Sequence, residues 1–463
     1  TIALYGAYAD ALQTLGAPRP AYGHSKDGRD DLKQVLLSLG VSGDGGIPLR
    51  LGVRDGNRSD SVETPRAIEE CLALGLAGMR GIVADSKAYS RCTLGMCLEH
   101  KVDLITLVPR TCAIRQVLEA WGRAQPVLPL VLEKPGRTKD EPPRCWHGQS
   151  VMRQVEVEYS DGRVTAETLR FVVVHSSQLA QQQAQTYASA QGKEAEVVTD
   201  HAKHVQAQWF ACLPDAETAL AAYEGQEQGR RGRRPRPWRY HAVRYRIVAD
   251  TRRTRRARRG RPSKTDPPPT ESGYRLVVEV EALANAAEDH GWTVLATTVD
   301  AEACPDVDIL QAYQDQNTTV EPGFRWIKHP AAIAPVWLEK PERIAALAML
   351  TVLGLLVYSV IQRQVRLYLR TYDQQIPGNK GMTATPTAAV VLALFAQVAL
   401  VQLWIDEQEV TQLSGVRPHH RLVCDALGLD ASWYAVPSAQ KNGRGMRSLS
   451  RGVATPTRVQ NRT

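Results

Sequence analysis

The residues best suited to chemistry are carboxylates with cations close by. Glu321 is followed by Arg325 and Lys328, and at about 100° per residue these positions fall within about 60° of one another on a helix. A carboxylate beside two cations on a rigid helix can hold a metal ion and a phosphate together. The alternative is an exposed helix with an ordinary Glu–Arg pair at i, i+4.

Asp85 is the second candidate carboxylate. It follows a short apolar run, GIVA at residues 81–84, which predicts a buried strand. In α/β folds, functional side chains gather at the C-terminal ends of central strands. The alternative is that Asp85 only caps a helix beginning near Ser86.

The elements expected to position Asp85 lie in residues 1–115, which alternate between strand and helix patterns. Apolar runs typical of strands occur at residues 32–42, 47–54, 81–84 and 104–108. The GDGG phrase at 43–46 predicts a hairpin turn between the first two. The Asp and Asn residues of DGNRSD, at 55–60, are expected to cap a helix over 61–76.

A mixed, β-containing domain is expected to be inserted at residues 116–290. Alternating polar and apolar residues predict strands at 154–159, 169–174, 243–248 and 274–280. A long polar stretch at 178–209 predicts a helix. Residues 292–299 return to a buried strand, ahead of the helix that carries Glu321.

Positive charge is concentrated in residues 230–264, which contain sixteen Arg or Lys residues. Trp238, Tyr240 and Tyr245 lie among them. Arginines neutralise phosphates and release counterions, and the phrase containing Arg259 and Arg261 (RGRP) fits a narrow minor groove. We therefore expect contact with nucleic acid; the alternative is a solvated charge run.

The totals agree with a folded protein of two or three domains. The chain has 463 residues, a formal net charge of +8 and 43% hydrophobic residues. Its eight cysteines are scattered, without the paired spacing of a zinc site, so we expect reduced thiols.

Two apolar runs, at 344–361 and 388–405, raise the alternative of membrane spans. We expect buried core helices instead, because helices buried on all sides have the same composition.

Several phrases together resemble the DDE transposases of bacterial insertion sequences, in the branch with a β-rich insertion before the catalytic Glu. They occur in the expected order and span residues 4–370. These phrases are LYGAY (4–8), YGHSKDGRDDLKQVLL (22–37), GDGGIPL (43–49), DGNRSD (55–60), ADSKAYS (84–90), FACLPDAETAL (210–220), RGRPSK (259–264), QDQNTTVEPGFRWIKHP (314–330) and LEKPERIAAL (338–347).

The resemblance implies an RNase H-like α/β core that binds two divalent ions, Mg²⁺ or Mn²⁺, through three carboxylates. Asp85 matches the second acid and Glu321 the third, so both are expected to be catalytic metal ligands. Lys328 matches a phosphate-binding residue, and Arg325 lies on the same face. The implied partner is double-stranded DNA, at transposon ends and target, bound by a homodimer. The implied location is the bacterial cytoplasm, in association with the nucleoid.

Three departures from the family pattern bear on activity. The first catalytic Asp would precede Thr1, so we expect an N-terminally truncated, incomplete enzyme with weak or no strand cleavage. Pro322 replaces a basic residue and is compatible with a helix only if it lies in the first turn. His329 replaces an Asp.

The expected fold is thus an RNase H-like core split by a mixed β-rich insertion domain. The expected domains are core halves at 1–115 and 291–380, an insertion at 116–290 with the Arg-rich segment, and a helical C-terminal part with a disordered tail at 381–463. The expected function is DNA transposition, a form of DNA recombination. The alternative is a non-catalytic nucleic-acid-binding protein acting through its Arg-rich segment.

Overall fold

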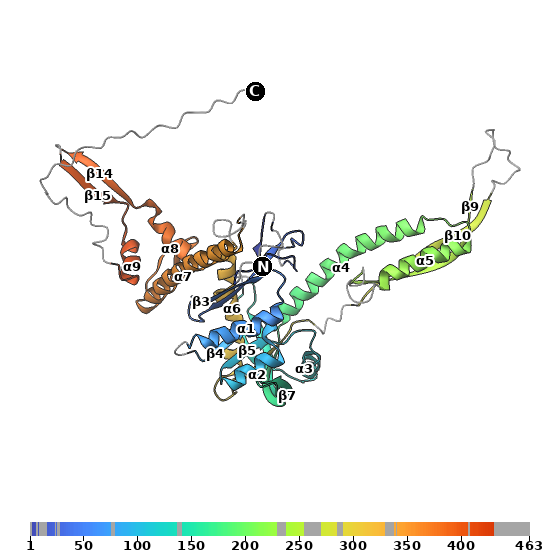
Figure 1. Cartoon of the computed structure of the whole chain (residues 1–463), viewed down its shortest axis with the longest axis horizontal. Coiled ribbons are helices and arrows are strands. Elements are labelled where there is room, and N and C mark those ends of the chain that lie inside the picture. The colour runs from blue at the N-terminus through green and yellow to red at the C-terminus, as the bar shows by residue number, and fades with distance from the viewer. Residues whose placement is uncertain are drawn as a thin grey trace, which may run out of the picture. The chain divides into compact units, whose positions relative to one another are not determined.

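The structure is a computed structural model of a mixed α/β protein (Figure 1). It describes residues 2–5, 8, 16–23, 25, 28–75, 79–136, 141–228, 238–253, 270–284, 290–328, 338, 340–405 and 408–429. The chain divides into two compact units. Unit 1 contains Thr1–Gly56 and Thr319–Thr463, and unit 2 contains Asn57–Thr318.

Unit 2 is built on a mixed six-stranded sheet with strand order β4-β5-β11-β8-β7-β6. β4 and β5 are parallel and the other neighbours are antiparallel. The strands are β4 (Gly81–Ala84), β5 (Asp103–Leu107), β6 (Leu130–Lys134), β7 (Arg144–Glu158), β8 (Val164–His175) and β11 (Trp292–Thr297). The strands predicted at 81–84, 104–108 and 292–299 are therefore confirmed. The expectation that 81–84 is buried is wrong, because β4 is an edge strand with partly exposed residues.

Helices cover both faces of this sheet. On one face, Phe171 and Val173 of β8 pack with Leu94 and Leu118, in a core that α1, α2 and α3 share. On the other, Val172 packs with residues of α6. The run FVVVH is buried on both sides, which explains its continuous apolar character. The helices are α1 (Asp60–Ala73), α2 (Arg91–Glu99), α3 (Ala113–Arg123) and α6 (Asp306–Ile327).

The predicted insertion, residues 116–290, is distributed over two places in unit 2. Strands β6, β7 and β8 pair into the sheet that contains β4, β5 and β11. The remainder forms a lobe from α4 (Ser177–Gln206), α5 (Leu213–Gln228), β9 (His241–Arg253) and β10 (Thr270–Ala282). In Figure 1, α4 leads from the sheet to this lobe, where β9 and β10 form an antiparallel ribbon. The core of the lobe includes Val198, Val205, Leu276 and Val278.

Glu194 ties α4 to the start of β9. Its carboxylate accepts hydrogen bonds from the backbone N–H groups of Arg239 (2.9 Å) and Tyr240 (2.7 Å), and lies 3.1 Å from Nδ1 of His241. Burial alone would raise the pKa of this carboxyl. The two N–H groups and His241 outweigh burial and lower the pKa of Glu194 below its ordinary value.

Because the folded-state pKa of Glu194 is lowered, its stabilising contribution is present above the ordinary pKa of 4.5 and is lost as the pH falls through the folded-state value. We expect Glu194→Gln to weaken the lobe by about 2 kcal/mol at neutral pH. Urea titrations followed by circular dichroism, at about pH 7 and about pH 4, measure this contribution. Equal acid sensitivity of wild type and Glu194→Gln would show that this carboxylate does not stabilise the lobe.

Unit 1 contains a three-stranded antiparallel sheet with order β1-β2-β3, against which α7 packs. The elements are β1 (Ile2–Ala3), β2 (Gln34–Val41), β3 (Pro48–Asp55) and α7 (Pro341–Thr371). The hairpin predicted around 43–46 is confirmed, and Gly46 has φ +67° at its end. The helix predicted after DGNRSD is α1, but Ser59 caps it by accepting from the N–H of Ser61, rather than an Asp or Asn.

The C-terminal part was predicted to be helical, and its described residues instead combine helices with strands. The second apolar run divides into α8 (Ala388–Leu394) and a strand, β14 (Ala399–Ile405), which pairs with β15 (Gln408–Ser414). A short apolar run is ambiguous between helix and strand, and here Val401, Trp404 and Ile405 favour the strand. A small hairpin, β12 (Ile376–Gly378) and β13 (Gly381–Thr383), precedes α8, and α9 (Pro418–Ala426) follows β15. The predicted disordered tail lies outside the described residues.

Within the described part of the chain, one helix is long and apolar enough to cross a membrane. It is α7, whose most apolar 18-residue window has a mean hydropathy of 2.5 and is 28% buried. Length and composition are weak evidence for a span, because core helices have them too.

All eight cysteines are free thiols, as predicted. Burial raises the pKa of Cys97 to about 11, so this thiol is unreactive.

Candidate active site and nucleic-acid interface

Asp85 lies immediately after β4, at the edge of the sheet where this strand and its parallel neighbour β5 end. Its backbone oxygen accepts a hydrogen bond from Oγ1 of the buried Thr106 (2.7 Å). Oδ1 of Asp85 accepts from the N–H of Lys87 (2.9 Å), and so caps the 3-10 helix Ser86–Ala88. The capping role is therefore real. The Asp85 side chain is nevertheless exposed, and one N–H bond leaves further lone pairs on the carboxylate available to a cation.

Tyr313 on α6 lies near enough to Asp85 for the negative charge of that carboxylate to act on its hydroxyl. Burial raises the pKa of the Tyr313 hydroxyl, the negative charge of Asp85 raises it further, and Arg115 opposes both. The hydroxyl therefore stays protonated and can donate a hydrogen bond. The sequence analysis did not single out Tyr313, because no local pattern shows which residue of a distant helix approaches Asp85.

Glu321, Arg325 and Lys328 are carried by the C-terminal end of α6. Glu321 and Arg325 are exposed and Lys328 is half-buried, whereas Ile327 is fully buried against the unit 1 core. Ile327 therefore faces the core, and Glu321 and Arg325 face solvent. Glu321 lies in unit 1 and Asp85 in unit 2, and the structure does not define one site that contains both.

Pro322 lies inside α6, not in its first turn. The helix begins at Asp306 and continues to Ile327, so it contains Pro322 in its interior, contrary to the expectation that a helix tolerates this proline only in its first turn. Pro322 has no N–H to donate to the carbonyl of Thr318, one turn earlier, and its ring crowds that carbonyl. The helix continues beyond it because Lys328 donates its N–H to Phe324 (3.0 Å) and Ile327 is packed in the core. His329 lies outside the described residues.

The donor chemistry of these carboxylates suits a hard divalent cation such as Mg²⁺ or Mn²⁺, which prefers oxygen ligands. Asp85 and Glu321 are both exposed, so a metal ion can reach each of them. Among the residues that the structure describes, no three or more His, Cys, Asp or Glu side chains form a group placed to hold a metal ion.

The candidate nucleic-acid interface is the ribbon of β9 and β10. The two strands carry five arginines and four carboxylates, so the ribbon itself is nearly neutral. Three of the arginines form exposed ion pairs: Arg246 with Glu279 (3.4 Å), Arg252 with Glu271 (3.0 Å) and Arg275 with Asp250 (3.2 Å).

The segment that joins the two strands, residues 254–269, carries six of the sixteen Arg and Lys residues of the Arg-rich stretch. The segment is flanked by Arg253 and Thr270, which form the last pair of the ribbon. Arg259 and Arg261 belong to this segment and lie outside the described residues.

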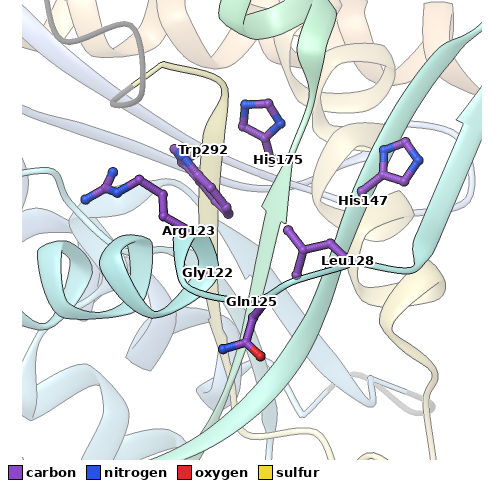
Figure 2. A pocket seen from close by; sticks show the side chains of 7 residues that line it. All are labelled: Gly122, Arg123, Gln125, Leu128, His147, His175 and Trp292. Carbon is purple, nitrogen blue, oxygen red and sulfur yellow. The ribbon is translucent and has the colours of Figure 1, made fainter.

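A pocket that the sequence did not indicate lies beside α3 (Figure 2). Its volume is about 560 Å³, and it is lined by Gly122, Arg123, Gln125, Leu128, His147, His175 and Trp292. His147, His175 and Trp292 occupy one row across β7, β8 and β11, because His175 pairs with both of the others. No local pattern could reveal this pocket, since the register of three strands from distant parts of the chain creates it.

The His175 imidazole of this pocket suits hydrogen bonding rather than charge. Burial lowers the pKa of His175, a hydrogen bond to the backbone of His290 opposes this, and His147 lowers the pKa further. The His175 ring lies 4.9 Å from the ring of Trp292, centroid to centroid. The His175 imidazole, the Trp292 indole and the Arg123 guanidinium together can bind a planar polar group with a nearby negative charge.

Comparison with models of known protein families gave no match, and comparison with curated proteins gave no significant match.

Proposed function

We propose that this chain binds double-stranded DNA and belongs, by function, with the DDE transposases of bacterial insertion sequences. Asp85 and Glu321 are the proposed metal ligands for cleavage and joining of DNA strands. The observation that carries the proposal is the exposed Asp85 carboxylate at the end of β4, together with the ordered sequence phrases that include Asp85 and Glu321. A six-stranded mixed sheet with helices on both faces is compatible with the RNase H-like core that the proposal requires.

Each residue has a distinct task in this proposal. Asp85 and Glu321 supply the oxygen ligands. Lys328 and Arg325 neutralise phosphate oxygens, and Tyr313, held protonated, donates a hydrogen bond to a phosphate near Asp85. Two bound Mg²⁺ or Mn²⁺ ions would activate a water or a DNA 3′-hydroxyl and stabilise the leaving oxygen.

DNA is held in this proposal mainly by the Arg-rich segment that joins β9 to β10, including Arg259 and Arg261. A basic segment can follow the phosphate backbone without base-specific contacts. The proposed partners are transposon-end and target DNA, the active form is a homodimer, and the proposed location is the bacterial cytoplasm and nucleoid.

A second candidate function is DNA binding without catalysis. Two observations favour it: Asp85 has a structural role as a helix cap, and the described residues contain no group of three metal-ligating side chains. In that case the Arg-rich segment performs the whole function, and neither Asp85 nor Glu321 matters for it.

Plasmid nicking in Mg²⁺ or Mn²⁺ separates the two candidates. Metal-dependent nicking by the full chain that is lost in Asp85→Ala and in Glu321→Ala supports catalysis. DNA binding that both substitutions leave unchanged, without nicking, supports the second candidate. Absence of DNA binding at protein concentrations of about 10⁻⁴ M would contradict both, because even non-specific binding proteins bind DNA there.

A further inference from the structure

Helix α7 exposes a row of apolar side chains along its whole length. Among its large apolar side chains, Leu350 is 65% exposed, Val357 57% and Leu353 47%. The full row, which we name the α7 seam, consists of Ala346, Leu350, Leu353, Val357, Val360, Gln364 and Leu367. Six of these seven side chains are apolar, and none of them packs in a core cluster of the described residues.

The α7 seam has the spacing of a coiled coil. Successive members are separated by 4, 3, 4, 3, 4 and 3 residues, which is the alternation of a and d positions over three heptads. Leu350, Val357 and Gln364 occupy the a positions. A single polar residue at a heptad a position, among apolar residues, fixes the register of helices that pair through such a seam.

The opposite face of α7 is already covered. Ile344, Ala348 and Leu355 pack in the core that α7 shares with β2, and Val365 and Leu369 pack in the cluster that includes Val391 and Val423. A helix packed along one side by a sheet and by other helices cannot be surrounded by lipid. The seam also continues past the uncharged stretch to Gln364 and Leu367, between Arg363, Arg366 and Arg370. A protein partner fits this surface better than a bilayer.

The size of the exposed surface is also typical of an interaction site. With Met349, which is 59% exposed beside the seam, the large apolar side chains together expose on the order of 500 Å². Monomeric proteins rarely expose one continuous apolar patch of this size unless it binds something. Two such surfaces in contact bury about 1,000 Å² or more, which is the lower end of a stable protein interface.

We infer that the α7 seam is a helix-pairing interface with a second copy of this chain. The complement of a heptad seam is another heptad seam. Among the three longest helices in the described part of the chain, α4 and α6 have mainly polar exposed faces. Of these three helices, only α7 therefore has an apolar heptad seam. A second copy supplies the complementary seam, and a two-fold axis closes the interface. The inference does not depend on DNA binding or cleavage.

The test is the oligomeric state of the full chain, measured by sedimentation equilibrium without detergent. We expect a dimer for wild type and a monomer for Leu353→Glu, because a charge at the centre of the seam would be buried without a partner. Gln364→Leu is expected to tighten the dimer by about tenfold or more, since it removes the polar a residue. Val197→Glu, at an exposed position of α4, is the matched control and should remain dimeric.

Three results would overturn the inference. The first is a wild-type chain that is monomeric, whether the seam is then solvated or covered by the chain itself. The second is a dimer that Leu353→Glu leaves intact. The third is a chain recovered only with detergent or vesicles, which would assign the seam to a membrane. Ala346→Glu, at a small exposed seam position, repeats the test if circular dichroism shows that Leu353→Glu does not fold.

Discussion

Replacing Arg170 by methionine is expected to lower the local stability around the start of α6 by about 3–5 kcal/mol. Arg170 is 3% exposed, on the central strand β8. Its guanidinium donates to the backbone oxygens of Cys304 (2.7 Å) and Asp300 (3.2 Å) and pairs with the carboxylate of Asp306. These contacts fix the turn that leads into α6.

The loss is large because Arg170→Met leaves several groups without their partner. The Asp306 carboxylate, which is 22% exposed, would lose its counterion. The backbone oxygen of Cys304 would also lose its donor, whereas that of Asp300 keeps the N–H of Cys304 (3.1 Å). An unsatisfied acceptor costs about 1–3 kcal/mol where it is buried. The start of α6 carries Tyr313, so loosening it would also displace the hydroxyl beside Asp85.

Native-state hydrogen exchange is the suitable measurement, because a chain of two units has no single unfolding free energy. Amides of β8 and of the first turns of α6 should exchange about a hundredfold faster or more in Arg170→Met. The control is Arg91→Met, which removes an exposed ion pair with Glu156 in the same unit and should cost about 0–1 kcal/mol. Equal protection in both variants would show that Arg170 does not hold this turn.

The second large effect concerns DNA affinity and salt. For Arg259→Gln combined with Arg261→Gln, we expect the slope of log K against log salt concentration to become shallower by about 2. Each lost phosphate contact removes about 0.9 from the slope. The affinity at low salt should fall by about tenfold or more, equally for unrelated duplex sequences, because phosphate contacts carry no base information.

The matched control is Arg66→Gln combined with Arg163→Gln. Both residues are exposed arginines of unit 2 that already pair with carboxylates, Arg66 with Glu70 and Arg163 with Asp161. This control removes the same total charge without touching the Arg-rich segment. If both double variants change the slope equally, DNA affinity depends on the net charge of the protein and not on residues 254–269.

Local signals in the sequence predicted single elements well. Residues 81–84 are β4, and the long polar stretch at 178–209 is α4, because strand alternation and helical composition are properties of neighbouring residues. The position of Asp85 at a strand end followed from the same signal.

Long-range pairing could not be predicted in this way. The alternating pattern at 154–159 does not show that β7 belongs to one sheet with β8 and β11, because the pattern of one strand does not identify the strand with which it pairs. For the same reason, the sequence could not predict that His147, His175 and Trp292 form one row or that Tyr313 lies near Asp85. Competing local signals account for other errors, as at Ser59, where a hydroxyl capped the helix in place of a nearby carboxylate.

The central proposal is that Asp85 and Glu321 are ligands of divalent metal ions, and Mn²⁺ binding to the full chain tests it most directly. Electron paramagnetic resonance of free Mn²⁺ measures that binding without requiring DNA cleavage. We expect Asp85→Asn and Glu321→Gln each to weaken Mn²⁺ binding by tenfold or more, because either amide removes a charged oxygen ligand. Glu342→Gln, on the exposed first turn of α7, should bind Mn²⁺ like wild type. Equal Mn²⁺ affinity in wild type, Asp85→Asn and Glu321→Gln would contradict the account.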